Sequence, residues 1–149
     1  MNLRIVPIAH GSEAYRDAVA LRHEVLRKPL GMSFTDEQLA AEKDAWHYAA
    51  YLSESGSERM VATAFFTLLD GKRVQLRQMA IAPDLQRKGV GRALLQRMEA
   101  DAAAKGIVEI RAEAREAALP FYRSLGYQAG GETFERVGLP HRSIGKRLR

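Results

Sequence analysis

Apolar residues recur along the chain with spacings that change from one segment to the next. A short apolar run at 3–8 predicts a strand, and the spacing within 12–26 predicts a helix with Ser12 as a suitable N-cap. Proline and glycine within 27–34 predict a loop, and residues 36–43 predict a short second helix. The expected apolar side of the first helix carries Ala14, Val19, Leu21, Val25 and Leu26.

The middle of the chain has the composition of strands. Two runs, 47–53 and 60–69, are rich in aromatic and β-branched residues, and a polar turn joins them. An Asp-Gly pair at 70–71 predicts a hairpin into a third strand at 72–82. Apolar and polar residues alternate in this strand until 79–81, where the alternation stops. We therefore expect burial on both faces or a β-bulge at that point.

The segment 90–105 has the most regular helical spacing, and Gly106 is expected to end the helix. A strand at 107–114 follows, and the order strand, helix, strand predicts a βαβ unit with parallel strands. Residues 115–126 predict a last helix, and 127–149 predict two further strands. On the helix 90–105, the face expected to be buried carries Val90, Leu94, Leu95, Met98 and Ala102, and the opposite face carries Arg92, Gln96, Glu99 and Ala103.

Composition limits the classes of protein that fit. The 149 residues suit one α/β (α+β) domain over 1–149, and 46% apolar with 28% charged residues is typical of a globular protein. Because the chain has no cysteine, disulfides, thiolate catalysis and cysteine zinc sites are excluded. It has neither a signal peptide nor an apolar run long enough to span a membrane, so we expect a cytoplasmic protein without a membrane partner. We also expect no metal, because metal-ligand spacing is absent among His10, His23, His47 and His141.

The charge of the chain is positive and unevenly distributed. A formal net charge of +5 favours an anionic partner such as nucleic acid, acidic lipid or a phosphorylated cofactor. Basic residues cluster at 71–78, 86–92 and 141–149 without the interleaved aromatics of a nucleic-acid-binding stripe, so we do not expect nucleic acid as a partner. The segment 32–46 is acidic, which indicates either attraction of an amine-bearing substrate or a solvated helix face. Its acidic residues are Asp36, Glu37, Glu42 and Asp44.

The sequence QRKGVGRAL, residues 86–94, combines two glycines with basic residues at the start of a helix. Glycine lets a backbone approach a phosphate, and the N–H groups of a helix N-terminus bind anions. A Walker A loop would need a Gly-Lys pair followed directly by Ser or Thr, whereas here Lys88 precedes Gly89 and no Ser or Thr follows. The dinucleotide fingerprint needs a third glycine, and Leu94 occupies that position. Both motifs therefore fit poorly. The remaining pattern, Gln-x-x-Gly-x-Gly, fits a pyrophosphate site or a simple turn.

With these motifs the chain resembles the GNAT N-acetyltransferase superfamily. LRQMAIAPDLQRKGVGRALLQRMEADAAAKG, residues 76–106, is similar to the acetyl-CoA-binding strand, loop and helix of that family. AREAALPFYRSLGY, residues 114–127, is similar to the segment that follows them. Residues 21–31 and 137–148 are similar to one group of small bacterial members.

The resemblance implies a mixed sheet of about six or seven strands with about four helices, splayed like a V around the pantetheine arm of acetyl-CoA. It implies that the backbone of Met79, Ala80 and Ile81 hydrogen-bonds the pantetheine and the acetyl carbonyl. Arg115 occupies a position where many members have asparagine, and it would reach a phosphate of coenzyme A or pair with Glu113. The pyrophosphate is expected at the backbone N–H groups of Gln86, Arg87, Lys88, Gly89, Val90, Gly91 and Arg92.

The implied reaction is attack by a neutral amine on the thioester. By the resemblance, Tyr122 is the acid beside the departing thiolate, acting by proton transfer or by a hydrogen bond alone. The acceptor is expected to be a small-molecule or peptide amine, and a homodimer is compatible with the sequence. The main alternative is a non-catalytic acyl-CoA sensor with the same fold. The base, direct or through water, has five candidates: Glu42, Asp44, His47, Glu132 and His141.

Overall fold

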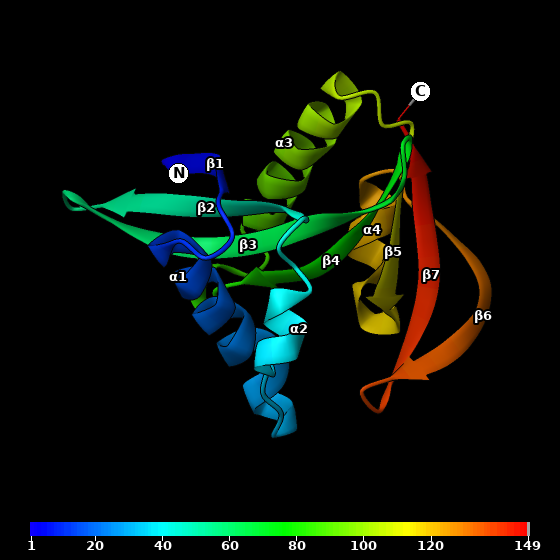
Figure 1. Ribbon diagram of the computed structural model, residues 1–149, viewed down its shortest axis with the longest axis horizontal. Helices are drawn as coiled ribbons and strands as arrows, with labels where there is room; N and C mark the ends of the chain where they lie inside the picture. The colour runs from blue at the N-terminus through cyan, green and yellow to red at the C-terminus, as the bar shows by residue number, and fades with distance from the viewer. Residues whose placement is uncertain (149) are drawn as a thin grey trace.

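In the computed structural model, which describes residues 1–148, seven strands form one mixed sheet in the order β1-β2-β3-β4-β5-β7-β6 (Figure 1). Within the described residues β4 and β5 are the parallel pair, and the other neighbours are antiparallel. The mixed sheet and the parallel pair agree with the expectation from sequence. The strands are β1 Leu3–Ile8, β2 Trp46–Glu54, β3 Ser57–Asp70, β4 Arg73–Ile81, β5 Glu109–Arg115, β6 Gln128–Arg136 and β7 Leu139–Arg147.

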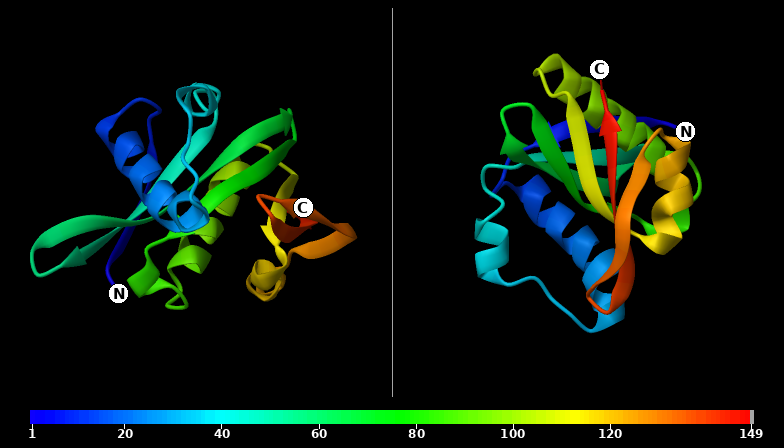
Figure 2. Two further views of the ribbon diagram at one scale, coloured as in Figure 1. Left: turned by 90° about the horizontal axis from the view of Figure 1, so that it is seen from below. Right: turned by 90° about the vertical axis from the view of Figure 1, so that its right-hand side faces the viewer.

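Four α-helices cover the two faces of the sheet. Figure 2 shows α1 and α2 on one face, and α3 and α4 on the other. A π-helical turn at His23–Arg27 and a 3₁₀ turn at Lys28–Leu30 continue α1 toward α2. Within residues 1–148 no helix has both the length and the apolarity to cross a membrane. The helices are α1 Glu13–Arg22, α2 Asp36–Ala40, α3 Val90–Ala104 and α4 Leu119–Ser124.

β4 and β5 separate after a short stretch of pairing. Their register joins Arg73–Leu76 to Glu109–Ala112, and both strands then continue without pairing to each other. On its other side β4 carries a bulge, because the register with β3 shifts between Thr63 and Phe65. Gln78 lies in this bulge with a φ of 54°. The interrupted alternation at 79–81 therefore reflects a bulge, which is one of the two structures expected at that point.

The buried face of α3 is wider than its apolar pattern predicts. Leu94, Met98 and Ala102 are buried as expected. Glu99, which we expected on the opposite face, is also buried, so that assignment was wrong. Its carboxylate accepts hydrogen bonds from the Tyr127 hydroxyl at 2.8 Å and the Lys146 ammonium at 3.0 Å. A paired carboxylate tolerates burial because its charge and lone pairs are satisfied.

The buried side of α1 also differs from the apolar side that the sequence predicted. Ser12 caps α1 by accepting a hydrogen bond from the Tyr15 N–H, as expected. The most buried positions, however, are Tyr15, Ala18 and Arg22, while the predicted apolar residues are only half-buried. The reason is that the 1% exposed Arg22 side chain has a carboxylate partner within the fold. The α-helix also ends at Arg22, earlier than predicted.

The C-terminal part follows its expected order with shorter helical structure. Instead of a helix over 115–126, a 3₁₀ turn at Glu116–Ala118 leads into α4, with Pro120 in its first turn. Proline fits there because the first N–H groups of a helix have no partner within it. The two strands expected within 127–149, of which residue 149 lies outside the described residues, are β6 and β7. They form an antiparallel hairpin with an irregularity between Gly130 and Phe134.

Candidate active site

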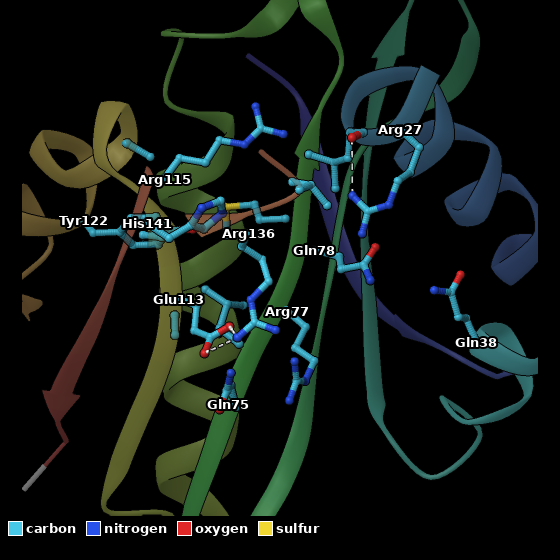
Figure 3. A pocket seen from close by; sticks show the side chains of 17 residues that line it. Arg27, Gln38, Gln75, Arg77, Gln78, Glu113, Arg115, Tyr122, Arg136 and His141 are labelled. Atoms are coloured by element: carbon cyan, nitrogen blue, oxygen red, sulfur yellow. Dashed lines mark hydrogen bonds and ion pairs between the residues drawn. The ribbon is translucent and has the colours of Figure 1, made fainter. Parts of the chain in front are cut away.

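A cavity of about 580 Å³ opens where β4 and β5 separate (Figure 3). Its walls come from both strands, from α4, from the β6–β7 hairpin, from α2 and from the turn after α1. Leu76 and Ala112 are paired neighbours and line the cavity at the point where the strands part. Polar residues next to them in sequence, including Gln75 and Glu113, also line it.

Tyr122, the acid expected from the resemblance, lies on α4 and lines this cavity. Its ring lies edge-on to Phe121, with centroids 5.0 Å apart, and to Tyr127 at 5.6 Å. Burial raises the pKa of the Tyr122 phenol to about 12. The hydroxyl is therefore protonated at neutral pH and suits hydrogen-bond donation better than full proton transfer.

His141 is the one candidate base among the five that lines the cavity. It lies on β7 directly opposite Arg115 of β5, and most of its side chain is buried. Its Nδ1 lies 2.9 Å from the carbonyl oxygen of Leu139. A carbonyl only accepts, so Nδ1 carries the proton, and in the neutral ring Nε2 is left with a lone pair. This tautomer suits a base.

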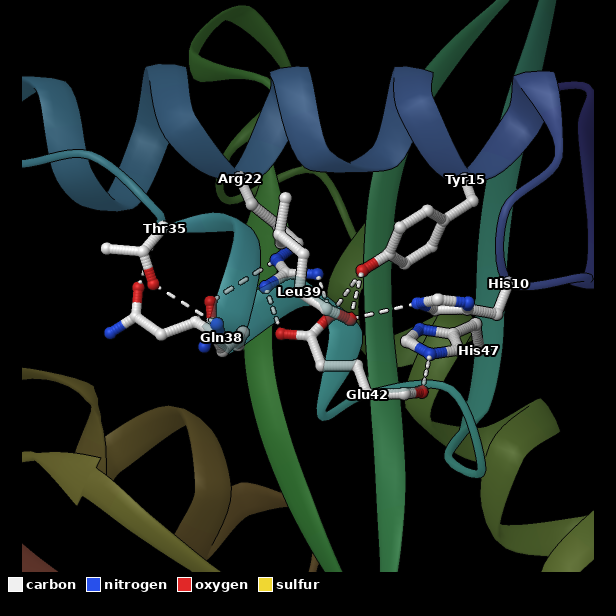
Figure 4. A network of polar contacts seen from close by, with 9 residues as sticks. His10, Tyr15, Arg22, Thr35, Gln38, Leu39, Glu42 and His47 are labelled. Carbon is white, nitrogen blue, oxygen red and sulfur yellow. Dashed lines mark hydrogen bonds and ion pairs between the residues drawn. The ribbon is translucent and has the colours of Figure 1, made fainter.

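Glu42 belongs to a buried network instead of the cavity (Figure 4). The Arg22 guanidinium donates to both of its carboxylate oxygens, at 2.8 and 2.7 Å, and the Tyr15 hydroxyl donates to one of them at 2.7 Å. Arg22 also donates to the Gln78 side-chain oxygen at 3.2 Å, which connects α1 to the bulge of β4. A carboxylate held in a bidentate pair is a structural element, so the structure does not support Glu42 as a base.

The other three candidates also lie away from the cavity. His47 is buried, with Nε2 2.9 Å from the Glu42 carbonyl oxygen, and burial lowers its pKa. Asp44 and Glu132 are exposed and do not line the cavity. The acidic segment 32–46 is thus partly neutralised by Arg22 and otherwise mostly solvated.

The loop before α3 has the features of an anion site. Arg87 and Gly89 have positive φ values of 65° and 86°, which turn the chain into the helix. Within the described residues no side chain caps α3, and its first turn has no acidic residue. Backbone N–H groups at this end are therefore left for a ligand or for water. The expected set spans Gln86, Arg87, Lys88, Gly89, Val90, Gly91 and Arg92.

Two side chains of this loop and one of its glycines have roles within the fold. The Gln86 amide donates to the Ile81 carbonyl at 3.2 Å, and Arg92 donates to the Ser124 hydroxyl at 3.1 Å. A Cβ on Gly91 would lie 3.3 Å from the Ile81 Cδ1 and from the Phe121 ring. Gly91 therefore lets α3 approach β4 and α4 closely, a packing reason that the sequence did not indicate.

The three β4 residues expected to meet the pantetheine lie beyond the last pair with β5. Met79 lines the cavity, and Ala80 is buried. Ala80 and Ile81 still pair with β3, so the strand is fixed on that side while its β5-facing edge has no strand neighbour. An unpaired strand edge presents N–H and C=O groups to a ligand.

Arg115 ends β5 and lines the cavity. The pairing with Glu113 that we considered does not form, because Arg136 takes the Glu113 carboxylate at 3.0 Å. Arg115 itself has no ion-pair partner in the part of the chain that the structure describes. The same part shows no group of three or more His, Asp or Glu side chains arranged to hold a metal ion.

Comparison with known proteins identifies the class to which this fold and site belong. The acetyltransferase (GNAT) domain matches residues 33–148, so the chain belongs to this family of N-acetyltransferases. It is 27% identical over 135 residues to the uncharacterized N-acetyltransferase YjcF of Bacillus subtilis (strain 168), covering 90% of this chain and 93% of that protein.

Solved structures show the same fold. A proposed N-acetyltransferase from Lactobacillus plantarum superposes with a TM-score of 0.84 at 19% identity, over 99% of both chains. A GNAT family acetyltransferase from Elizabethkingia anophelis with acetyl-CoA bound superposes with a TM-score of 0.72 at 15% identity, over 98% of both chains. The splayed seven-stranded sheet is therefore a GNAT fold.

Sequence reasoning missed Arg22 and Gln78. Arg22 follows Tyr15 and Ala18 at helical spacing, which was the available signal that a charged residue shares their buried face. For Gln78 the signal was the failed alternation one residue later. Neither pattern identifies the partner, because Glu42 and Gln78 are 20 and 56 residues from Arg22 in sequence.

Proposed function

We propose that this chain transfers an acetyl group from acetyl-CoA to a primary amine by direct attack in a ternary complex. The observation that carries the proposal is the cavity between the separated strands, which has Met79 on one side and Tyr122 on the other. The thioester supplies the acetyl group, since a new C–N bond replaces the C–S bond and coenzyme A leaves as a thiolate.

The residues present fit acetyl-CoA. The loop 86–92 offers uncapped backbone N–H groups and basic side chains for the pyrophosphate. Residues 79–81 offer an unpaired strand edge for the pantetheine. The Elizabethkingia anophelis structure with acetyl-CoA bound supports this assignment by analogy of fold.

Tyr122 and His141 have complementary roles in this proposal. The neutral Tyr122 hydroxyl donates a hydrogen bond to the sulfur as negative charge develops there. His141 Nε2 accepts a proton from the attacking ammonium or amine, directly or through water. Deprotonating an alkylamine of pKa about 10.4 costs about 4–5 kcal/mol at pH 7, so a positioned base has a clear advantage.

The test has two stages. Acetyl-CoA at about 100 times its Kd should raise the free energy of unfolding by about 2.7 kcal/mol, measured as a thermal shift. A screen of small amines and peptides for thiol release would then find acceptors. No stabilisation by acetyl-CoA contradicts the proposal. Stabilisation without thiol release from any amine would favour the acyl-CoA sensor.

A further inference from the structure

The wall of the cavity holds more positive than negative charge. Four arginines line it against a single carboxylate. Arg136 and that carboxylate, Glu113, form an ion pair at 3.0 Å and balance each other. The remaining three, Arg27, Arg77 and Arg115, have no carboxylate partner among the described residues.

Arg27 is held in place with most of its hydrogen-bonding capacity unused. Its guanidinium stacks on the Phe34 ring at 4.7 Å, and Arg22 stacks on the same ring at 4.6 Å. The one hydrogen bond that this guanidinium donates within the described chain is a long contact of 3.3 Å to the Leu26 carbonyl. Burial lowers the pKa of Arg27, and the nearby charges of Arg22 and Arg115 lower it further.

Arg115 faces Arg27 across the cavity. Figure 3 shows the two guanidinium groups directed inward from opposite walls, one from β5 and one from the turn after α1. Both side chains are half-buried. Arg22, although close by, is committed to Glu42 in its bidentate pair. Two partly desolvated like charges without a counterion favour an anion between them.

We propose that the acceptor amine also carries an anionic group, a carboxylate or a phosphate, which Arg27 and Arg115 hold together. This inference rests on the proposed function and specifies its substrate class. A guanidinium matches either anion with two parallel N–H donors, and charge-assisted hydrogen bonds of this kind are about twice as strong as neutral ones. Polycationic amines are disfavoured, because the surplus arginines repel them.

The surplus charge also assists the chemistry. A like charge disfavours the protonated form of a bound amine and so lowers its pKa. An anionic anchor at Arg27 and Arg115 therefore brings the amine into an environment that helps to release its proton. His141, opposite Arg115 in the β5–β7 register, lies beside this position.

The experiment uses matched pairs of amines that differ in one anionic group. Amino acids and dipeptides are compared with their C-terminal amides, and phosphoethanolamine with ethanolamine, by kcat/KM for thiol release. The carboxylate pairs and the phosphate pair distinguish the two anions. The variants are Arg27→Gln and Arg115→Gln, and the control is Arg16→Gln, which removes an arginine from the exposed side of α1.

We expect at least one anionic amine to exceed its neutral twin by about tenfold or more in kcat/KM. Each cavity variant should remove that preference mainly through KM, so that both members of a pair react with similar kcat/KM, while Arg16→Gln keeps the preference. Equal rates for both members of every pair overturn the inference. A preference that survives in both cavity variants also overturns it, because the anion is then held elsewhere.

A second measurement needs no turnover. With coenzyme A saturating its own phosphate site, inorganic phosphate should raise the melting temperature of the wild type and of Arg16→Gln, but not of either cavity variant. An equal response in all four proteins contradicts the inference. If acetyl-CoA and coenzyme A do not stabilise the wild type, the proposed function itself fails. If they do and the phosphate response is uniform, only the acceptor class is wrong.

Discussion

At the scale of single residues, burial decides which polar side chains serve the fold and which face the cavity. Glu42 and His47 had suitable chemistry for a base, yet they lie in a buried network. Tyr122 and His141 line the cavity instead. Burial keeps the phenol of Tyr122 protonated, and the Leu139 carbonyl sets which ring nitrogen of His141 carries the proton in the neutral tautomer.

Replacing Tyr122 by phenylalanine removes only the hydroxyl. We expect kcat to fall on the order of 10²-fold, because the departing sulfur loses its donor, while the Kd for acetyl-CoA is unchanged. Steady-state kinetics and calorimetry measure the two quantities. Tyr127→Phe is the control, since that hydroxyl is bonded to Glu99 and its loss should lower stability without lowering kcat comparably. Wild-type turnover in Tyr122→Phe would refute the role.

Replacing His141 by asparagine separates its two functions. The asparagine amide can still donate toward the Leu139 carbonyl, but it has no basic nitrogen to replace Nε2 of the histidine. We expect kcat/KM near pH 7 to fall on the order of 10²-fold. The deficit should shrink as pH rises toward the pKa of the amine, because the substrate then loses its proton without help. A deficit independent of pH would indicate a purely structural role.

At the scale of elements, the Arg22–Glu42 pair joins α1 to the segment after α2 and, through Gln78, to the β4 bulge. The β4 bulge lines the cavity, together with the turn that follows α1 and with Gln38 of α2. The pair is 1% and 9% exposed, so its energetics differ from those of a surface ion pair. Its value is to fix the relative position of three elements that come together only in the fold.

A double-mutant cycle tests this arrangement. Arg22→Met or Glu42→Leu alone leaves one buried charge unpaired, and each should lower the free energy of unfolding by about 3–5 kcal/mol. The double variant should be considerably more stable than the sum of the two losses predicts. Denaturant unfolding measures all four proteins. Strict additivity would contradict the pair as described. The matched surface control is Arg4→Met with Glu58→Leu, an exposed pair whose cycle should be close to additive.

At the scale of the whole molecule, the sheet both encloses the core and opens the site. Pairing of β4 with β5 over four positions holds its two halves together, and their divergence afterwards creates the cavity. α3 packs against the half of the sheet formed by β1 to β4, with Leu94, Leu95 and Met98 fully buried. Stability and substrate access therefore depend on the same pair of strands.

Stability of the whole fold should depend on pH through His47. Burial lowers its native pKa below its ordinary value of 6.5, so the unfolded state binds the proton more readily. The contribution of His47 to the free energy of unfolding is then fully present above about pH 6.5 and is lost as pH drops toward the native pKa. Unfolding measured at pH 7.5 and 5.5 should show a larger loss for wild type than for His47→Gln. Equal losses would contradict the assignment.

Short-range patterns predicted much of this protein. The hairpins, the βαβ unit, the Ser12 cap and the bulge near 79–81 follow from residues close together in sequence, because local backbone preferences and alternation act over a few positions. The motifs at 76–106 and 114–127 indicated the family and directed attention to the loop and to Tyr122. Helix ends were less well predicted, since the π-helical turn after Arg22 has no sequence signal of its own.

By itself, then, the sequence determined the order of elements and the family, and it predicted which loop would meet a phosphorylated cofactor. Only the tertiary structure decided which charges are neutralised: Glu42 by Arg22, Glu113 by Arg136, and Glu99 by Lys146. The physical reason is that a charge is buried or free according to its partners, and these partners are 20 or more residues away in the chain. Arg27 and Arg115 are left without a carboxylate partner among the described residues, and both line the cavity. We propose that these two charges direct the choice of acceptor.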